Sequence, residues 1–319
     1  MILILSRPND YDTHLVIEWL HHYKTPFFRL NDEELMSGET SIKYYNGDVI
    51  LKNQIEINLN QIKVVWFRKF GFLSDLEDQL GKNSDLMNYI SKEFKSLSTY
   101  LIDKLADKTW LFDKKLNVSK IEMLDKAKMA NIKFPDTLIC SKKSDLKDFF
   151  IKNNKSLITK SIGDGNYIKH EDDCFKFQTH KIESIDHFED QFSPSFFQAY
   201  IEKEIEIRTF YLGGCCYSMA IFSQQNEKTK LDFRNYDLEK PNRYVPYKLP
   251  DALESNIKKF MDSINLNTGS LDILKSSADS EYYFLEVNPC GQFGMTSDPC
   301  NYNLHEKVAQ FLKTAIYEN

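Results

Sequence analysis

The chain has 319 residues, and its 41 Lys and Arg against 47 Asp and Glu give a formal net charge of −6 at pH 7. A chain of this length can form two or three lobes, each with its own hydrophobic core. Its composition is that of a soluble globular protein. A net acidic surface does not favour non-specific nucleic-acid binding, which depends on cations that displace counterions. No nucleic-acid partner is therefore expected.

Targeting signals and disulfides are not indicated either. The first apolar run, Ile2–Leu5, is short, and no later run approaches the roughly 18 apolar residues of a membrane helix. We therefore expect no signal peptide, no membrane partner and a cytoplasmic location. The six cysteines form no CxxC pair and have no histidine at zinc spacing, so they are expected to be reduced thiols. A catalytic Cys290 or Cys300 with His305 is a minor alternative.

The first part of the chain alternates short apolar strands with amphipathic helices, the pattern of an α/β lobe. A continuous apolar run such as 1–5 is expected in a strand that is buried on both faces of a parallel sheet. We place a first domain at about 1–112. Its predicted elements are strands at 1–5, 26–30 and 64–68, helices at 12–23 and 85–105, and a hairpin turned at Asn46-Gly47.

The rest of the chain mixes helices with a strongly β region. The polar stretch 163–195 is typical of a mobile subdomain rich in hairpins, and Gly213-Gly214 predicts a two-residue turn between two strands. The predicted elements are helices at 118–131, 144–153, 250–266 and 303–316, and strands at 137–140, 156–162, 196–201, 204–212, 215–222, 270–274 and 282–287.

The segment Glu286-Val287-Asn288 ends an apolar strand with two oxygen donors. Because residues i and i+2 of a strand share a face, Glu286 and Asn288 are expected to point the same way, while Leu285 and Val287 point into the core. Asp272 lies in a similar strand about one hairpin earlier. If the two strands pair, three hard oxygen ligands come together, a set that suits Mg²⁺.

A second polar strand is Glu204-Ile205-Glu206-Ile207-Arg208, in which alternation places Glu204, Glu206 and Arg208 on one face. This face suits a nucleotide, with a carboxylate for the ribose hydroxyls and an Arg for a phosphate or a substrate carboxylate. A solvated face with paired charges gives the same pattern. The spacing does not distinguish Glu204 from Glu206 as the ribose ligand.

Two lysines fit a phosphate site. Lys160 ends an apolar strand and precedes the small-residue loop 161–165, whose backbone could approach phosphates closely. Lys120 opens the helix at 118–131, where backbone N–H groups favour anions. The chain has no GxxxxGK[ST] motif, so it is not a P-loop protein.

Taken in order, these segments resemble the ATP-grasp superfamily, over about 115–319. The family pattern is a lysine ahead of a helix, a second lysine on a strand of a mobile subdomain, an adenine hinge, a strand with carboxylates and Arg, and an Asp…Glu-x-Asn metal set. The resemblance implies an α/β (α+β) ATP-grasp fold with three parts. These are an N-terminal α/β pre-grasp domain at 1–112, a central mobile lid subdomain at 113–195, and a C-terminal antiparallel-sheet subdomain with the Mg·ATP site at 196–319.

The same resemblance implies a role for each matching residue, with ATP and Mg²⁺ as cofactors. Phosphates would be held by Lys120 and Lys160, adenine by the hinge Gln198-Ala199-Tyr200-Ile201, ribose by Glu204 or Glu206, and Mg²⁺ by Asp272, Glu286 and Asn288. Arg208 would stabilise the transferred phosphoryl group or the acyl phosphate oxyanion, and Lys160 is also a catalytic candidate. Arg234 is a candidate for binding substrate carboxylates.

Within the superfamily, the stretch Leu285–Tyr302 is similar to graspetide synthetases, the peptide maturases related to microviridin ligases, and especially to the grasp-with-spasm group. The segments Val65–Lys69 and Ser218–Gln224 are also similar. This implies ATP-dependent macrocyclisation of a ribosomally made precursor peptide. An Asp or Glu side chain is phosphorylated and then attacked by a Ser or Thr hydroxyl, which gives an ester, or by a Lys amine, which gives an amide.

The implied partner is a precursor peptide with a leader and a core. We expect the leader to dock on residues 225–247, whose Tyr236, Arg243, Tyr244 and Tyr247 are typical of binding surfaces. Ligases of this kind are often dimeric, which makes a homodimer the expected assembly. Two alternatives remain open: a RimK-like ligase that adds amino acids to a protein or peptide, and a non-catalytic peptide-binding protein with a grasp fold.

Overall fold

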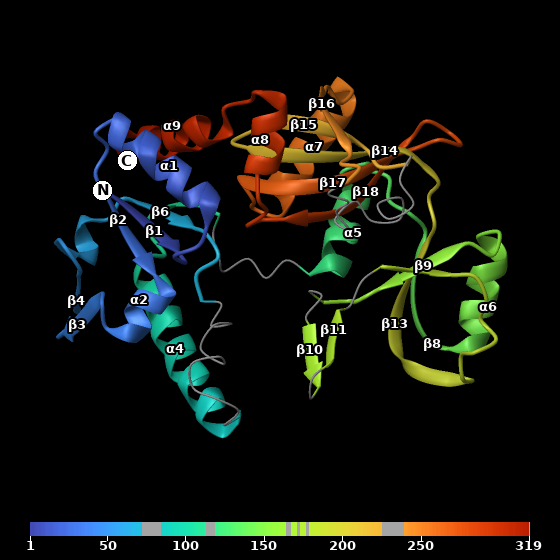
Figure 1. Ribbon diagram of the computed structural model, residues 1–319, viewed down its shortest axis with the longest axis horizontal. Coiled ribbons are helices and arrows are strands. Elements are labelled where there is room, and N and C mark those ends of the chain that lie inside the picture. The colour runs from blue at the N-terminus through green and yellow to red at the C-terminus, as the bar shows by residue number, and fades with distance from the viewer. Residues whose placement is uncertain are drawn as a thin grey trace. The chain divides into compact units, whose positions relative to one another are not determined.

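The computed structural model describes residues 1–71, 84–112, 119–163, 167–170, 173–176, 179–224 and 239–318. The chain forms two compact units (Figure 1). Unit 1 comprises Met1–Leu116, Asn265–Gly269 and Pro289–Asn319, and unit 2 comprises Asn117–Ile264 and Ser270–Asn288. A division into three domains, at 1–112, 113–195 and 196–319, stays a prediction.

A four-stranded parallel sheet is at the centre of unit 1 (Figure 1). Its strands in spatial order are β2 (Phe27–Asn31), β1 (Ile2–Ser6), β6 (Val64–Phe67) and β7 (Thr109–Leu111). Every residue of β1 and β6 is buried, as expected of strands that are covered on both faces. Helices α1 (Tyr11–His22), α2 (Asp32–Ser37) and α4 (Ser84–Lys104) belong to the same unit. The predicted β-α-β start and long helix are confirmed.

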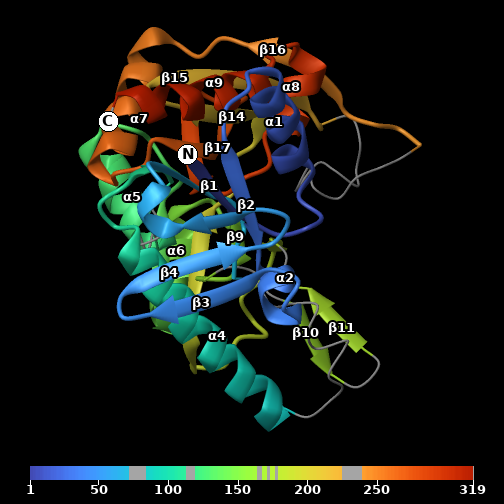
Figure 2. The same ribbon diagram turned by 90° about the vertical axis from the view of Figure 1, so that its left-hand side faces the viewer.

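A three-stranded sheet in unit 1 contains the hairpin that the Asn46-Gly47 pair predicts (Figure 2). Its strands are β3 (Ser41–Tyr45), β4 (Asp48–Lys52) and β5 (Glu56–Asn58). Asn46 and Gly47 have φ angles of 48° and 97°. Both central residues of a type I′ turn need this left-handed backbone, so Asn-Gly closes the two-residue hairpin.

The C-terminal segment packs on the N-terminal elements of unit 1. Helix α9 (Leu304–Tyr317) contacts α1 and β6, and the short helix α8 (Gly294–Cys300) contacts α9. The apolar face of α9 includes Leu304, Val308 and Leu312, all of which are buried. Burial of this face joins the end of the described chain to its beginning in one unit.

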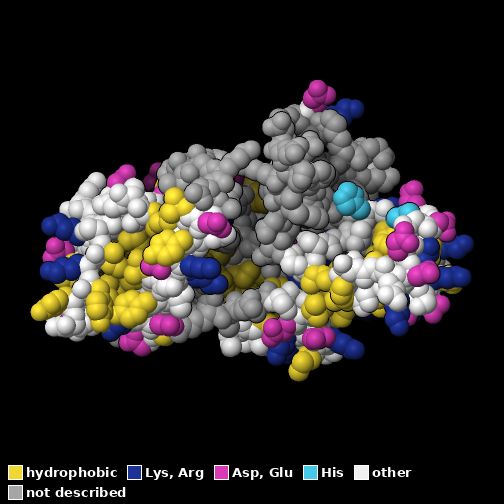
Figure 3. Space-filling model, turned by 90° about the horizontal axis from the view of Figure 1, so that it is seen from below, with side chains coloured by type: hydrophobic (Ala, Val, Ile, Leu, Met, Phe, Trp, Pro, Cys, Tyr) yellow, Lys and Arg dark blue, Asp and Glu magenta, His cyan; other side chains and the backbone are white. Residues whose placement is uncertain are grey.

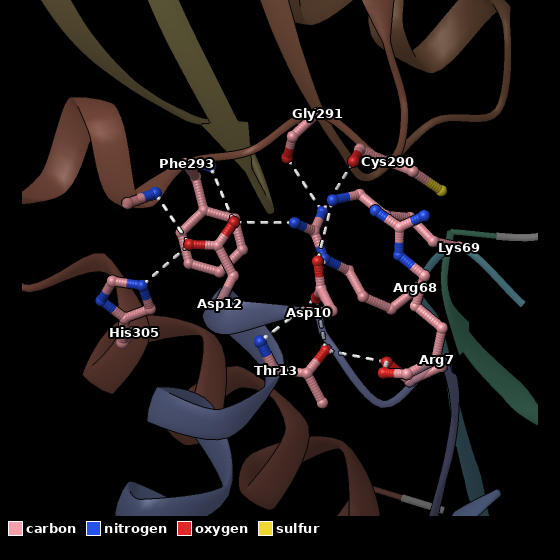
Figure 4. A network of polar contacts seen from close by, with 12 residues as sticks. Arg7, Asp10, Asp12, Thr13, Arg68, Lys69, Cys290, Gly291, Phe293 and His305 are labelled. Atoms are coloured by element: carbon pink, nitrogen blue, oxygen red, sulfur yellow. Dashed lines mark hydrogen bonds and ion pairs between the residues drawn. The ribbon is translucent and has the colours of Figure 1, made fainter. Parts of the chain in front are cut away.

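A buried arginine connects the loop before α8 to the parallel sheet (Figure 4). Arg68 directly follows β6 and is 3% exposed. Its Nε donates to Asp10 at 3.0 Å and its Nη2 to Asp12 at 2.7 Å. Its Nη1 donates to the carbonyl oxygens of Cys290 and Gly291, at 2.8 and 2.9 Å. The guanidinium therefore pairs with two carboxylates and fixes the backbone of the loop.

Asp12 extends this network toward α8. Its two carboxylate oxygens accept hydrogen bonds from the backbone N–H groups of Phe293 and Gly294, and one oxygen lies 3.0 Å from Nε2 of His305. Burial raises the pKa of Asp12, but hydrogen bonding to His305 and the charge of Arg68 hold that pKa below its ordinary value. A Cβ at Gly294 would lie 2.7 Å from Asp12 Oδ1, so this approach requires a glycine.

Unit 2 contains a four-stranded antiparallel sheet and a separate hairpin. The sheet has the order β12 (His180–Ile182), β9 (Leu157–Lys160), β13 (Gln191–Ala199) and β8 (Thr137–Lys142), and the hairpin pairs β10 (Tyr167–His170) with β11 (Asp173–Lys176). Helix α6 (Lys143–Lys152) packs on β8 and buries Leu146 and Phe150 against Leu157 and Phe197. The hairpin predicted within 163–195 is confirmed, and the mobility of that stretch stays a prediction.

A five-stranded sheet follows in unit 2. Its order is β16 (Arg243–Tyr247), β15 (Cys215–Phe222), β14 (Lys203–Leu212), β17 (Thr268–Ser276) and β18 (Tyr282–Asn288). Strand β15 is antiparallel to β14 and β16, and β17 is antiparallel to β18. The predicted Gly213-Gly214 turn joins β14 to β15, with φ angles of 54° and 97°. Helices α5 (Lys120–Met129) and α7 (Asp251–Ser263) pack on each other.

The hairpin turn gives a test of the fold. We expect Gly47→Ala to destabilise unit 1 by about 1 kcal/mol, because an L-residue tolerates a left-handed backbone poorly. No atom lies within 4 Å of the Cβ position at Gly47, so the loss comes from the backbone conformation and not from a clash. The urea unfolding midpoint measures the loss. Gly163→Ala is the control, because its Cβ also meets no atom within 4 Å and its φ is not left-handed. Equal losses in both variants would contradict the assignment.

Candidate functional site

A pocket in unit 2 is lined by residues of both of its larger sheets. Part of the lining is apolar and part is charged, with basic and acidic side chains together. A ligand with a flat apolar ring and an anionic end fits such a lining. The apolar residues are Pro135, Ile158, Ala199, Ile201, Leu274 and Leu285, and the polar ones are Lys160, Thr179, Tyr200, Lys203, Glu206, Asp272 and Glu286.

The predicted hinge reaches this pocket through Ala199, Tyr200 and Ile201. Gln198 is not among the lining residues. It is fully buried, and its side-chain amide donates to Oγ1 of Thr137 at 3.0 Å. The hinge therefore meets the pocket at the end of β13 and just beyond it, and Gln198 anchors the end of that strand to β8.

Two backbone N–H groups of the hinge already donate hydrogen bonds within the protein. The N–H of Ala199 donates to the carbonyl of Asp136 at 2.8 Å, and the N–H of Tyr200 donates to the carbonyl of Ser156 at 3.0 Å. The N–H of Ile201 makes no hydrogen bond within the described part of the chain. A pocket-lining amide of this kind can donate to a ligand acceptor.

The two glutamates of β14 have different surroundings. Glu206 is buried in the pocket lining, where its Oε1 accepts from Nζ of Lys203 at 2.6 Å and from Oγ of Ser223 at 2.7 Å. Glu204 is exposed and pairs with Lys275 at 2.7 Å, outside the pocket. The structure thus brings Glu206, and not Glu204, to the pocket.

Lys203 is a pocket residue that the sequence pattern does not reveal. It is 5% exposed and pairs with Glu206 three residues later. Residues i and i+3 of a regular strand point to opposite faces, so this pair is not expected from alternation. A charged residue directly before a β run is the one available signal.

The predicted metal ligands lie on paired strands. Asp272 of β17 is opposite Glu286 of β18, and Ser270 is opposite Asn288. Nη1 of Arg208 donates to both carboxylate oxygens of Asp272, at 2.7 and 2.9 Å. Two carboxylates and an amide oxygen are hard donors of the kind that Mg²⁺ accepts, usually together with phosphate oxygens. Asp272 and Glu286 line the pocket, whereas Asn288 is exposed and is not among the lining residues. The two paired carboxylates fit a magnesium ion.

Leu285 differs from its predicted position in the core. Asp272 pairs with Glu286. The next residue of β17, Ile273, pairs with Phe284, so Leu285 is an extra residue in β18. A β-bulge of this kind interrupts strict alternation. As a result Leu285 is half-buried and lines the pocket beside Glu286, and the prediction that it points into the core is wrong.

The two predicted phosphate lysines occupy different places. Lys160 lines the pocket, and its Nζ lies 5.4 Å from the ring centroid of Phe196. Lys120 is not in the lining. Its Nζ donates to the carbonyl oxygens of Gly163 at 2.8 Å and Ser161 at 3.4 Å, so it holds the loop that follows β9.

The structure describes one of the two arginines that the sequence predicts to be in the site. Arg208 is buried on β14, and its Nε has no hydrogen-bond partner within the described residues. Arg234 lies in 225–238, outside the described residues, as does the end of the small-residue loop at 164–165. The role of Arg234 stays a prediction.

A catalytic thiol is not supported. Burial raises the pKa of Cys290, and it raises the pKa of Cys300 to about 11, so both stay protonated near neutral pH. His305 faces the carboxylate of Asp12. A catalytic pair of Cys290 or Cys300 with His305 would therefore lack an activated thiolate.

No protein-family model and no curated protein matches the sequence. Solved structures do match along nearly the whole chain. A RiPP-associated ATP-grasp ligase of Chryseobacterium gregarium has a TM-score of 0.83 and 23% identity, over 99% of this chain and 96% of that chain. The macrocyclase MdnC of Microcystis aeruginosa MRC has a TM-score of 0.81 and 21% identity, over 98% and 100% of the two chains.

A RimK domain ATP-grasp protein of Sphaerobacter thermophilus DSM 20745 also matches, with a TM-score of 0.56 and 11% identity over 98% of both chains. The chain therefore has the fold of the ATP-grasp ligases, as the order of its motifs predicts. The fold is more similar to that of the two peptide ligases than to that of the RimK domain protein.

The contrast between the two glutamates can be tested by stability. Glu206→Gln should destabilise unit 2 by on the order of 3 kcal/mol, because it leaves the buried ammonium of Lys203 without its carboxylate. Glu204→Gln removes an exposed ion pair and should change stability by less than about 1 kcal/mol. Urea unfolding of both variants checks the difference. A similar small loss in both would show that Lys203 is not a buried charge.

Proposed function

We propose that this chain is an ATP-dependent macrocyclase of a ribosomally synthesised precursor peptide. An Asp or Glu carboxylate of the peptide attacks the γ-phosphorus of ATP, so that ADP leaves and an acyl phosphate forms. A Ser or Thr hydroxyl or a Lys amine then attacks the acyl carbon, and phosphate leaves. Each ester or amide bond forms with the net loss of one water.

The observation that carries the proposal is the pocket of unit 2. There Asp272 and Glu286 face each other on paired strands, and Lys160 lines the same pocket, in a chain with the ATP-grasp ligase fold. The similar ligase of Chryseobacterium gregarium was solved with ADP and a leader and core peptide, and MdnC was solved with its precursor peptide MdnA. These complexes support a nucleotide and a peptide as the two substrates.

The pocket lining suits ATP in particular. The hinge offers the N–H of Ile201 to an adenine nitrogen, and Ile158 and Leu285 provide apolar surface for the flat ring. We assign the carboxylate of Glu206 to the ribose hydroxyls and Lys160 to the phosphates, because both side chains line the pocket. Lys120, which holds the loop carbonyls at 161 and 163, would act on the phosphates by fixing that loop.

Asp272, Glu286 and Asn288 would hold Mg²⁺. When bound, the metal supplies positive charge to the β- and γ-phosphate oxygens during transfer. A similar ligase, PsnB, was solved with Mg and ADP, which supports this assignment. Arg208 orients Asp272 through its two hydrogen bonds. The Nε of Arg208 has no hydrogen-bond acceptor among the described residues.

The protein needs no nucleophile of its own for this chemistry. It has to place a peptide carboxylate in line with the γ-phosphate and exclude water from the acyl phosphate. Positive groups near the reacting oxygens lower the barrier by stabilising the charge that develops on them. In this chain Arg208 and Lys160 are the described candidates for that role, and Arg234 stays a third.

A RimK-like ligase is the alternative of the same chemical class. The two candidate activities share the Mg·ATP site and differ in the acceptor. The TM-score of 0.83 to a peptide ligase against 0.56 to a RimK domain protein favours the macrocyclase. The paired carboxylates and the buried Arg208 and Lys203 also speak against a non-catalytic binding protein, because such charges destabilise a pocket that has no use for them.

The leader of the precursor peptide is proposed to dock near β16. Among the described strands, β16 is at the edge of the five-stranded sheet, and peptides can bind to a sheet by adding a strand at such an edge. Arg243 of β16 is exposed and lies 5.4 Å from the ring centroid of Phe222. Tyr236 and the rest of 225–238 lie outside the described residues.

A homodimer is also proposed. Hydrophobic side chains gather on part of the surface of unit 1 (Figure 3). Large exposed ones in this unit include Tyr44 and Tyr45 of β3, an edge strand, and Tyr89 of α4. Such a surface supports a protein contact, with a second copy as the simplest partner.

Among the described helices, none is long and apolar enough to cross a membrane. A cytoplasmic location is proposed because ATP and Mg²⁺ are available there.

The central test removes a metal ligand. Glu286→Gln should abolish ring closure, because it takes one negative charge from the proposed magnesium site and keeps the shape of the side chain. The substrate is a precursor peptide rich in Thr, Ser, Glu and Asp, such as one encoded beside the gene. Mass spectrometry after incubation with Mg·ATP counts losses of 18 Da per bond. Omitting Mg²⁺ from the wild-type reaction should abolish the same losses.

Glu281→Gln is the matched control. Glu281 directly precedes β18 and is exposed, and its carboxylate forms a surface ion pair with Lys133 at 3.0 Å. This variant should cyclise the peptide at the wild-type rate, and both variants should keep the wild-type thermal unfolding midpoint within a few degrees. Full activity of a folded Glu286→Gln protein would refute the metal assignment.

A further inference from the structure

The parallel sheet of unit 1 carries basic residues at the carboxyl ends of its strands. Arg7 directly follows β1 and Lys69 comes two residues after β6. The two strands pair in parallel with Leu5 opposite Phe67, so the same register places position 7 opposite position 69. Arg29 of β2 reaches the same loop, where its Nη2 donates to the carbonyl oxygens of Arg7 at 2.6 Å and Pro8 at 3.2 Å.

The carboxylates near the carboxyl ends of these strands already have hydrogen-bond partners. Asp10 accepts from Arg68, from Nζ of Lys69 at 2.8 Å, and from the backbone and hydroxyl of Thr13. Asp12 is engaged with Arg68, His305 and the loop before α8.

The acids beside β2 are engaged as well. Asp32 accepts from the backbone N–H groups of Glu33 and Gly71. Glu34 accepts from Asn31 and Thr40, and its charge acts on Arg29 without an ion pair between them.

Two guanidiniums at this end of the sheet have no carboxylate partner among the residues that the structure describes. Within the described part of the chain, Arg29 donates to two carbonyl oxygens and to Oδ1 of Asn31. Arg7 is half-buried, and its side chain has no hydrogen bond or ion pair with any described residue, although its Nε is buried. Figure 4 shows Arg7 on the side of the network where Lys69 and Cys290 lie. A buried donor without an acceptor destabilises the protein unless a ligand or water completes it.

The position of these groups matches a general feature of α/β sheets. The chain runs from β1 to β2 on one side of β1, and β6 lies on the other side. The gap between β1 and β6, at their carboxyl ends, is therefore the point where the strand order reverses. Ligands of open parallel sheets bind at this point. Arg7 and Lys69 flank it.

The loop after β1 also indicates the chemistry of the ligand. Phosphate sites at this point of a sheet usually have glycines and open backbone N–H groups at a helix N-terminus. Here the loop is Arg7-Pro8-Asn9-Asp10, Pro8 has no N–H, and Asp10 caps α1 with its own carboxylate. Recognition must come from the guanidinium side chains, whose planar geometry matches a carboxylate.

We propose that Arg7 and Arg29, beside Lys69, form a carboxylate-binding site at the switch point of unit 1, and that its ligand is an acidic side chain of the peptide substrate. The substrate class rests on the proposed function, while the site itself does not. The acidic residue held here is a positioning residue of the peptide and is distinct from the carboxylate that is phosphorylated in unit 2.

Binding without nucleotide tests the site separately from catalysis. The probes are a fluorescein-labelled peptide of alternating Thr and Glu, acetylated and amidated at its ends, and the same peptide with Gln in place of Glu. Fluorescence anisotropy with the full chain should show tighter binding of the Glu peptide. Arg7→Gln should weaken Glu-peptide binding about tenfold and leave Gln-peptide binding unchanged, because it removes a charge-assisted contact.

Lys43→Gln is the matched control, because Lys43 is an exposed cation of unit 1 on β3 and the substitution changes the net charge by the same amount. It should bind both peptides as the wild type does. Arg7→Lys should recover part of the affinity. Equal binding of the Glu peptide by Arg7→Gln and wild type would overturn the site. If inorganic phosphate displaces the Glu peptide from the wild type at lower concentration than glutarate does, the carboxylate assignment is overturned.

Steady-state kinetics can distinguish a failure of this inference from a failure of the proposed function. With a precursor peptide and Mg·ATP, Arg7→Gln should raise KM for the peptide about tenfold and leave kcat near the wild-type value, because the reacting groups of unit 2 are intact. An equal KM for both proteins would argue against a substrate role. If wild-type protein closes no ring in any acidic peptide but still prefers the Glu probe through Arg7, the proposed function fails and the site stands.

Discussion

The buried guanidinium of Arg68 is the interaction on which the arrangement of unit 1 depends. Burying a charge is unfavourable unless its partners satisfy it, and removing one partner from such a group leaves an uncompensated charge inside the protein. Here two carboxylates and two backbone carbonyls receive its hydrogen bonds. The pKa of Asp10 is held below its ordinary value by Arg68 and Lys69 although burial raises it. Asp10 therefore stays ionised opposite the guanidinium over the ordinary pH range.

Charge compensation also shapes the pocket of unit 2. Lys203 lies against Glu206 and Arg208 lies against Asp272, so two cations and two anions are fixed by one another without help from a ligand. Side chains that are ordered beforehand lose little entropy when ATP or a metal binds. Arg208 and Asp272 belong to neighbouring strands, β14 and β17, so the sheet itself sets their separation.

Much of the fold could be predicted from local patterns. Asn46-Gly47 and Gly213-Gly214 mark hairpins because only certain residues accept a left-handed backbone, and the buried runs of β1 and β6 mark a parallel sheet. The pairing of Asp272 with Glu286 follows from two apolar strands of matching pattern.

Other features have no local signal. The bulge at Leu285 breaks the period of two, and nothing in the surrounding sequence shows it. Glu204 and Glu206 share a face, so only the position of the pocket along the strand separates them. The attachment of residues 290 and 291 to Arg68 joins positions more than two hundred apart, and hydrophobic periodicity carries no information about such a contact.

The division of the chain between its two units has a consequence for its synthesis on the ribosome. The chain passes between the units four times, and α8 and α9, which cover part of unit 1, come after all of unit 2. During translation the early sheet exists for a long interval without the helix that packs on β6 and without the loop carbonyls that Arg68 binds. The carboxylates of Asp10 and Asp12 can hold that guanidinium meanwhile, since both are encoded before it. The final packing of unit 1 can therefore begin only after the strand bearing Glu286 has been made.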